Sequence, residues 1–134
     1  MTASSTAGRT LALSVVADVA LVLVFVLIGR SSHAEGFSVL GTLVTLWPFL
    51  AGLVVGWLVA RAWRRPTTVL GAGIPVWIAT VVVGMLLRVI SGQGIQVSFV
   101  IVAAIVLAIF LLGWRAIVAW IARARRIRRA GETA

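Results

Sequence analysis

Four long apolar runs, separated by short polar segments, dominate the chain. They cover Leu11–Gly29, Val39–Ala60, Val69–Ile90 and Val97–Ile121. Each run reaches the roughly 20 residues that a helix needs to cross about 30 Å of hydrocarbon. Lipid offers no hydrogen-bond partners, so a spanning segment must satisfy its own backbone, which favours helices. The pattern predicts an all-α, polytopic membrane protein, with short connections that make sequence neighbours antiparallel in one four-helix bundle.

The composition supports a membrane protein and removes several kinds of chemistry. The 134 residues are 62% hydrophobic, whereas a typical soluble domain is about 45–50% apolar. There is no cysteine, which excludes disulfides, thiolate metal sites and cysteine catalysis.

The positive charge indicates how the chain is oriented. The formal net charge is +9, and all twelve basic residues are arginine. If the helices alternate in direction, only Arg30 and Arg88 fall on one side, and the other ten arginines share the opposite side. Positive charge is retained on the cytoplasmic side, so we expect both termini in the cytoplasm and the chain in the bacterial cytoplasmic membrane. Residues 1–10 would then be a short cytoplasmic segment, 11–121 the transmembrane domain, and 122–134 a basic cytoplasmic tail.

Small and polar residues predict which helix faces point inward, because lipid is as apolar as leucine. Each run carries one such stripe: Ser14, Asp18, Phe25 and Gly29; Gly41, Thr45, Gly52 and Gly56; Gly73, Trp77, Thr80, Gly84, Arg88 and Ser91; Ala104, Ala108 and Arg115. The G-x-x-x-G step at Gly52 and Gly56 suits close packing within the chain, with a dimer interface as the alternative.

The tryptophans divide into two groups. Four of them lie near the expected cytoplasmic boundary, where an amphipathic ring is favoured: Trp57, Trp63, Trp114 and Trp120. Trp47 and Trp77 lie deeper, and we expect both to pack between helices.

Asp18 is the most informative polar position, since a charged side chain inside the bilayer costs roughly 2.5–3.5 kcal/mol on insertion scales. It lies about 10 Å inside the boundary near Leu11. Arg88 would be about 18 Å away in depth, whereas Arg115 lies at a similar depth and is the expected partner. An Asp18–Arg115 pair would fix the first helix against the fourth. A proton or cation relay and a protonated, hydrogen-bonded carboxyl are the alternatives.

A second polar group is expected at the other side of the membrane. Arg30, His33 and Glu35 follow the first helix, and Arg88 and Gln93 lie around the last connection. Together they could bind an anion or respond to pH through His33. Alternatively, the two arginines only extend to the lipid headgroups. One histidine and one carboxylate make neither a metal site nor a catalytic triad.

The C-terminal tail is strongly basic. It should continue the fourth helix and contact anionic lipid headgroups, at about 1 kcal/mol for each well-placed arginine. The residues expected to do so are Arg123, Arg125, Arg126, Arg128 and Arg129. We expect no nucleic-acid partner, because the arginines follow the ends of apolar runs.

The ordered motifs A-D, G-R-S-S-H-A-E-G, W-P-F-L-A-G, W-R-R-P, V-V-G-M-L-L-R, S-G-Q-G, S-F and G-W-R resemble a family of small actinobacterial four-helix membrane proteins. It is catalogued as domain of unknown function 3054, and the resemblance spans about Leu11 to Ile121. It implies a multi-pass membrane protein and supplies no activity. The positions that it marks are Asp18, Gly29, Arg30, His33, Pro48, Arg88, Ser91, Gly92, Gly94 and Arg115.

These observations favour a non-enzymatic membrane protein, with a structural or accessory role and no cofactor. Its expected partners are the bilayer and either a second copy of the chain or another membrane protein. The alternative is a small oligomeric transporter or channel that uses Asp18 and the outer arginine and histidine cluster. An intramembrane enzyme would need a nucleophile with a base or a set of metal ligands, whereas the chain offers one histidine and three scattered carboxylates.

Overall fold

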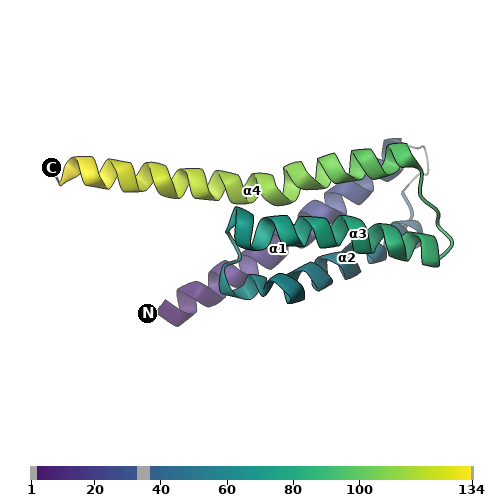
Figure 1. Ribbon diagram of the computed structural model, residues 1–134, viewed down its shortest axis with the longest axis horizontal. Coiled ribbons are helices and arrows are strands. Elements are labelled where there is room, and N and C mark those ends of the chain that lie inside the picture. The colour runs from purple at the N-terminus through teal and green to yellow at the C-terminus, as the bar shows by residue number, and fades with distance from the viewer. Residues whose placement is uncertain (1–2, 33–36, 134) are drawn as a thin grey trace.

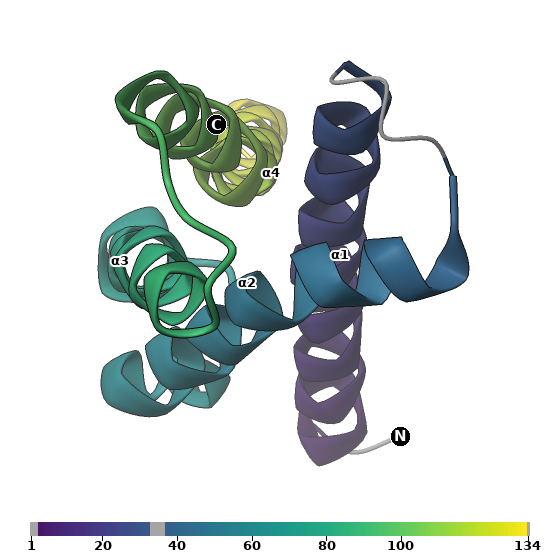
Figure 2. The same cartoon turned by 90° about the vertical axis from the view of Figure 1, so that its right-hand side faces the viewer.

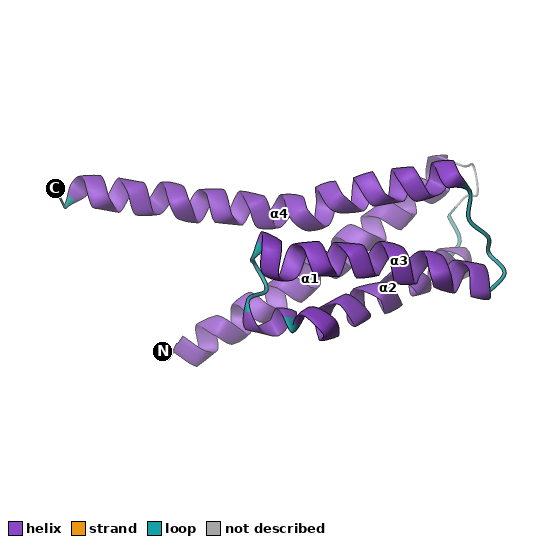
Figure 3. Ribbon diagram, in the orientation of Figure 1, coloured by secondary structure: helices purple, strands orange, loops and turns teal. Residues whose placement is uncertain are grey.

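The computed structural model describes residues 3–32 and 37–133, which form helices joined by short connections (Figures 1 and 3). The long helices are α1 (Ala3–Ser32), α2 (Val39–Ala60), α3 (Ile74–Ile90) and α4 (Val97–Glu132). A 3₁₀ turn at Ala62–Arg64 and a π-helical turn at Val69–Gly73 lie between α2 and α3. The described residues contain no strand.

Within the described residues, four helical segments are long and apolar enough to cross a membrane. The predicted all-α fold is therefore confirmed, and the chain is a multi-pass membrane protein. Large apolar side chains cover the outside of the bundle, as in Val39, Leu58 and Ile90, each more than half exposed. In water such a surface would be very unfavourable, whereas in hydrocarbon it has no cost.

Both termini lie at one end of the bundle, together with the connection between α2 and α3 (Figure 1). We call this end the terminal end, and the opposite end, which holds the connection between α3 and α4, the distal end. At the terminal end α4 continues alone past the other helices (Figure 1). Its 36 residues would span about 54 Å, so the predicted helical continuation of the tail is confirmed.

Helices α2 and α3 approach each other closely through glycine. A Cβ atom on Gly52 would lie 2.9 Å from the Cα of Thr80, and one on Gly56 would lie 2.8 Å from the Cα of Val76. Only a residue without a side chain fits at such a contact. The G-x-x-x-G step therefore packs within the chain, as expected.

Helix α1 is inclined to the others: viewed from the distal end, it lies across the picture while α3 and α4 appear nearly end-on (Figure 2). Its buried Phe25 contacts α2 edge-on, with 5.2 Å between its ring centroid and that of Phe49. The apolar core continues along one face of α4, through Ala103, Leu107 and Leu111.

Two details of the predicted packing were wrong. The buried face of α4 is formed by Ala103, Leu107, Leu111 and Arg115, whereas Ala104 and Ala108 are only half-buried at its border. Helix α4 contacts both α1 and α3, and the fully buried Leu107 and Leu111 fill the interior on this face. Trp47 is 44% exposed and so does not pack between helices. Trp77 does, and it donates a hydrogen bond to the Ala104 carbonyl at 2.9 Å.

Candidate functional site

The centre of the terminal half of the bundle contains a fully buried carboxylate. Asp18 lies on the inward face of α1, one turn after Ser14, whose hydroxyl donates to the Thr10 carbonyl at 2.7 Å. Both side chains are almost completely buried. Thr10, Ser14 and Asp18 thus form a polar stripe along one face of α1. It begins at the terminal end, and Asp18 is its innermost member.

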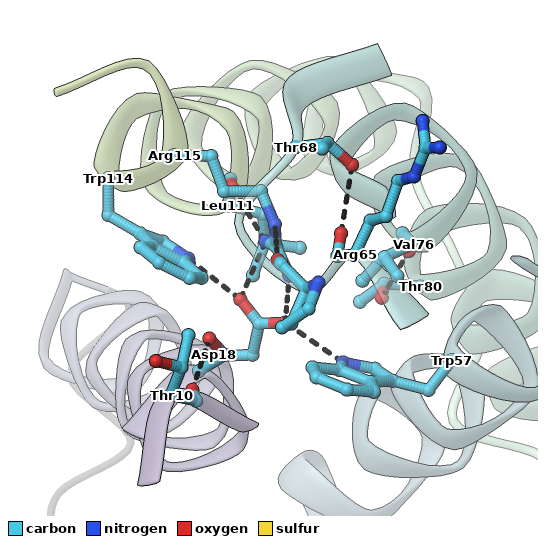
Figure 4. A network of polar contacts seen from close by, with 12 residues as sticks. Thr10, Asp18, Trp57, Arg65, Thr68, Val76, Thr80, Leu111, Trp114 and Arg115 are labelled. Carbon is cyan, nitrogen blue, oxygen red and sulfur yellow. Dashed lines mark hydrogen bonds and ion pairs between the residues drawn. The ribbon is translucent and has the colours of Figure 1, made fainter. Parts of the chain in front are cut away.

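Four donors surround this carboxylate (Figure 4). Arg115 forms a two-pronged ion pair, with Nη1 2.8 Å from Oδ1 and Nη2 2.7 Å from Oδ2. The indole of Trp57 donates to Oδ2 at 2.9 Å, and that of Trp114 donates to Oδ1 at 2.8 Å. Each oxygen therefore accepts two hydrogen bonds, and the parallel guanidinium–carboxylate geometry is the strongest form of such a contact. We refer to Asp18, Trp57, Trp114 and Arg115 as the carboxylate cluster.

Arg115 is itself held from several sides. Its Nη1 donates to the Leu111 carbonyl at 2.8 Å, and its Nε donates to the Pro66 carbonyl at 2.9 Å. Its guanidinium also lies 4.5 Å from the centroid of the Trp114 ring. The cluster consequently connects α1, α2, α4 and the segment between α2 and α3. A buried charge pair is tolerated only when most of its remaining hydrogen-bonding capacity is satisfied; here the carboxylate accepts four hydrogen bonds and the guanidinium donates four.

The sequence predicted the Asp18–Arg115 contact but missed both indoles. Trp57 and Trp114 were assigned to the membrane boundary, yet each is half-buried and directs its N–H inward. A usable signal was present, because a carboxylate has about four acceptor positions and one guanidinium fills only two. Two further donors at the depth of Asp18 were therefore required.

A pocket of about 520 Å³ lies at the distal end. The described residues that line it are Phe25, Val26, Gly29, Arg30, Thr45, Phe49, Arg88, Gln93, Gly94, Ile95, Gln96 and Phe99. They come from all four helices and from the connection before α4. We call this the distal pocket.

Arg30 is directed into the bundle. It is 9% exposed, and its Nη1 donates to the Gly41 carbonyl and to the Thr45 hydroxyl, each at 3.1 Å. The alternative in which Arg30 extends to the headgroups is therefore wrong. The reason is that the first turns of α2 offer acceptors at the same depth, with glycine leaving room for the guanidinium.

Arg88 reaches the same pocket from α3. Its Nη1 donates to the Gln93 side-chain oxygen at 3.0 Å, and its Nε donates to the Gly94 carbonyl at 3.3 Å. The guanidinium lies 4.8 Å from the centroid of the Phe99 ring. The structure thus brings Arg30, Arg88 and Gln93 to one pocket, as the predicted cluster requires. The other two members of that cluster, His33 and Glu35, lie outside the described residues.

The five arginines of the tail do not form a pocket. They are exposed along the part of α4 that extends beyond the bundle. Within the described part of the chain, no three His, Cys, Asp or Glu side chains lie close enough together to hold a metal ion.

Comparison with known proteins gives one result. The model of the family described as "Protein of unknown function (DUF3054)" matches residues 15–118. Neither the curated proteins nor the solved structures include a match. The matched range contains the carboxylate cluster and every described residue of the distal pocket, and it covers most of the sequence. The chain belongs to the DUF3054 family of proteins.

Proposed function

We propose that this protein is a non-enzymatic membrane protein with a structural or accessory role. The main support for this proposal is the set of contacts that Asp18 makes. Both of its oxygens already accept two hydrogen bonds, and its charge is paired with Arg115 at 2.7 Å. A proton or cation relay needs a carboxylate that can exchange partners. Freeing this one would break contacts to two other helices at once, with a large penalty for an uncompensated buried charge.

The same contacts argue against intramembrane catalysis. Asp18 is the single acidic residue within the four apolar runs, and its lone pairs are directed at Arg115, Trp57 and Trp114. A general base must reach a substrate proton within hydrogen-bonding distance. No acceptor site on this carboxylate is left for that purpose.

The part of α4 beyond the bundle supports an accessory role. Residues 116–132, here called the α4 extension, are exposed along their whole length. Ile117, Trp120 and Ile127 recur at spacings of three and seven residues, which places them on one side of the helix. Three of the tail arginines lie on the opposite side of the helix: Arg125, Arg126 and Arg129. This combination suits contact with anionic headgroups near the bundle and with another membrane protein.

The proposal is tested by native mass spectrometry of the protein, extracted gently from its own membrane. The comparison is with a chain that ends after Ile121. A defined complex with a second protein, lost on this truncation, supports an accessory role. A homo-oligomer that carries a reproducible small molecule instead supports the transporter and contradicts the proposal.

We also propose that both termini face the cytoplasm and that the membrane is the bacterial cytoplasmic membrane. The unequal distribution of arginine supports this orientation. Because the chain has no cysteine, a single introduced cysteine can be labelled selectively and reports the orientation directly. In intact cells, an impermeant maleimide should label Ser91→Cys, whereas Thr133→Cys should react only after permeabilisation. The reverse pattern would invert the topology.

A further inference from the structure

We propose that a second pocket, at the terminal end of the bundle, binds the headgroup of one anionic phospholipid through Arg64 and Arg65. Its volume is about 620 Å³, within the usual range of roughly 300–1,000 Å³ for small-molecule sites. The described residues that line it are Thr6, Ala7, Thr10, Trp63, Arg64, Arg65, Pro66, Thr67 and Thr68. We call this the terminal pocket. It includes none of the tail arginines, and its occupancy does not depend on the accessory role proposed above.

The two arginines belong to a segment whose backbone is fixed on both sides. Ala62 is 1% exposed and anchors the 3₁₀ turn in the bundle, and its carbonyl accepts the Arg65 N–H at 3.2 Å. The Arg65 carbonyl accepts the Thr68 hydroxyl at 2.8 Å (Figure 4), and the Pro66 carbonyl accepts a hydrogen bond from α4 at 2.9 Å. Arg64 and Arg65 are themselves exposed. The fold therefore holds both side chains beside the first turns of α1 before any ligand arrives.

The terminal pocket combines positive charge with neutral hydroxyl groups. Arg64 and Arg65 are adjacent in the sequence, and no carboxylate is among the described residues that line the pocket. Asp18, the acidic residue of α1, is already paired within the carboxylate cluster. Guanidinium groups bind phosphate through parallel hydrogen bonds. Thr6 and Thr67 add hydroxyl groups that can donate to the phosphate or bind the polar part of a headgroup. This combination favours an anionic headgroup.

The surroundings of the pocket favour a lipid over free phosphate. Val59 and Leu70, on either side of the connection between α2 and α3, are each more than three-quarters exposed. In a membrane such side chains contact acyl chains, so the connection between them lies at the depth of the headgroups. Trp63 is 45% exposed, lines the pocket and is of the residue type that is enriched at this boundary. A phosphate that is attached to acyl chains is thus concentrated beside the pocket, whereas free phosphate gains nothing from the apolar surface.

The charge of the site is tested by two matched double variants of the full chain. Arg64→Gln/Arg65→Gln removes two positive charges from the terminal pocket. Arg128→Gln/Arg129→Gln removes two positive charges from the α4 extension. All four side chains are exposed, so neither change disturbs the core, and the net charge falls equally in both.

The space in the site is tested by a second matched pair. Ala7 lines the pocket from α1, so Ala7→Leu occupies room that the headgroup needs. Ala12 is exposed on the same helix and does not line the pocket. Ala12→Leu therefore makes the same change in α1 outside the proposed site.

The experiment is native mass spectrometry in maltoside micelles, with dilauroyl phosphatidylglycerol as the probe. The measured quantity is the apparent dissociation constant of the first bound lipid. Dilauroyl phosphatidylcholine and inorganic phosphate are the comparison ligands. Binding to Arg64→Gln/Arg65→Gln should be weaker by roughly tenfold or more, and we expect a loss of the same order in Ala7→Leu. The wild type, Arg128→Gln/Arg129→Gln and Ala12→Leu should bind the first lipid alike. Circular dichroism confirms that each variant is folded.

Several results would overturn the assignment. An equal loss in both double variants would show that the lipid responds only to net charge. Equal binding of phosphatidylcholine would show that the pocket does not select an anion. Inorganic phosphate that displaced the lipid at equal concentration would make free phosphate the ligand. Unchanged binding in folded Ala7→Leu would place the lipid elsewhere on the protein.

Discussion

The substitution Asp18→Asn tests the carboxylate cluster most directly. It keeps the size of the side chain and one acceptor oxygen while removing the negative charge. Arg115 would still reach the carbonyls of Pro66 and Leu111, but its charge would be uncompensated in a fully buried position. One of the two indole N–H groups would also face the new amide NH₂ and lose its acceptor.

The expected loss can be estimated from these contacts. Removing one partner of a buried ion pair typically costs about 3–5 kcal/mol. An interhelical hydrogen bond in a membrane contributes on average about 0.6 kcal/mol, so the lost indole contact adds little. Because folded domains are stable by only about 5–15 kcal/mol, the variant should lose roughly a fifth or more of its free energy of unfolding.

The assay is equilibrium unfolding in mixed micelles with increasing dodecyl sulfate, followed by far-ultraviolet circular dichroism. Tryptophan emission is a poor probe here, because Trp57 and Trp114 contact the altered group. Asp18→Asn, Arg115→Gln and the double variant form a thermodynamic cycle. We expect the double variant to be more stable than the sum of the single losses predicts, by on the order of 2 kcal/mol.

Two results would refute this reasoning. A loss below about 1 kcal/mol for Asp18→Asn would be no larger than that of an ordinary interhelical hydrogen bond. Simple additivity in the double variant would show that Asp18 and Arg115 do not act as a pair. Either result would return Asp18 to the candidates for a transported proton or cation.

Three further predictions concern packing, the indole contacts and the tail. Gly52→Leu should destabilise the fold by at least about 1–3 kcal/mol through overpacking, because its Cβ atom meets the α3 backbone at 2.9 Å; Gly113→Leu in the same unfolding assay should not. Trp57→Phe replaces the indole with a smaller phenyl ring and removes one donor; loss of that hydrogen bond should cost about 0.6–1.7 kcal/mol in that assay, and a larger loss would mean that packing of the indole also stabilises the fold. A chain ending after Ile121 should keep its unfolding midpoint but lose flotation with phosphatidylglycerol vesicles, at about 1 kcal/mol for each headgroup contact removed; unchanged flotation would contradict the assigned role of the tail.

The helices could be predicted from the sequence because the membrane imposes a simple rule on length and hydropathy. Val39–Ala60 was predicted with the bounds that the structure shows. Asp18 could be paired with Arg115 because depth follows from counting residues along a helix. The start of α1 was less clear from the sequence pattern, because the residues before Leu11 are largely polar or small and yet are helical from Ala3.

Rotation and inclination of the helices were harder to predict. The small residues Ala104 and Ala108 led to the wrong predicted face of α4, whereas the fully buried residues of that helix include Ala103, Leu107 and Leu111. The inward direction of Arg30 depends on acceptors in the first turns of α2, and these are brought to it only by tertiary packing. Long amphipathic side chains such as tryptophan and arginine can serve a boundary or an interior equally well, so their type alone does not decide between them.

The carboxylate cluster also has a consequence for how the protein is made. Asp18 and Arg115 are 97 positions apart in the sequence, so the ribosome completes α1, α2 and α3 before the partner of Asp18 exists. Trp57, 39 positions after Asp18, is the first member of the cluster to become available, and it brings one hydrogen bond and no charge. Until its last helix emerges, the nascent chain therefore carries an acidic side chain without its ion-pair partner. Entry of α4 into the bilayer is thus the step that brings Asp18 its ion-pair partner, together with the indole of Trp114.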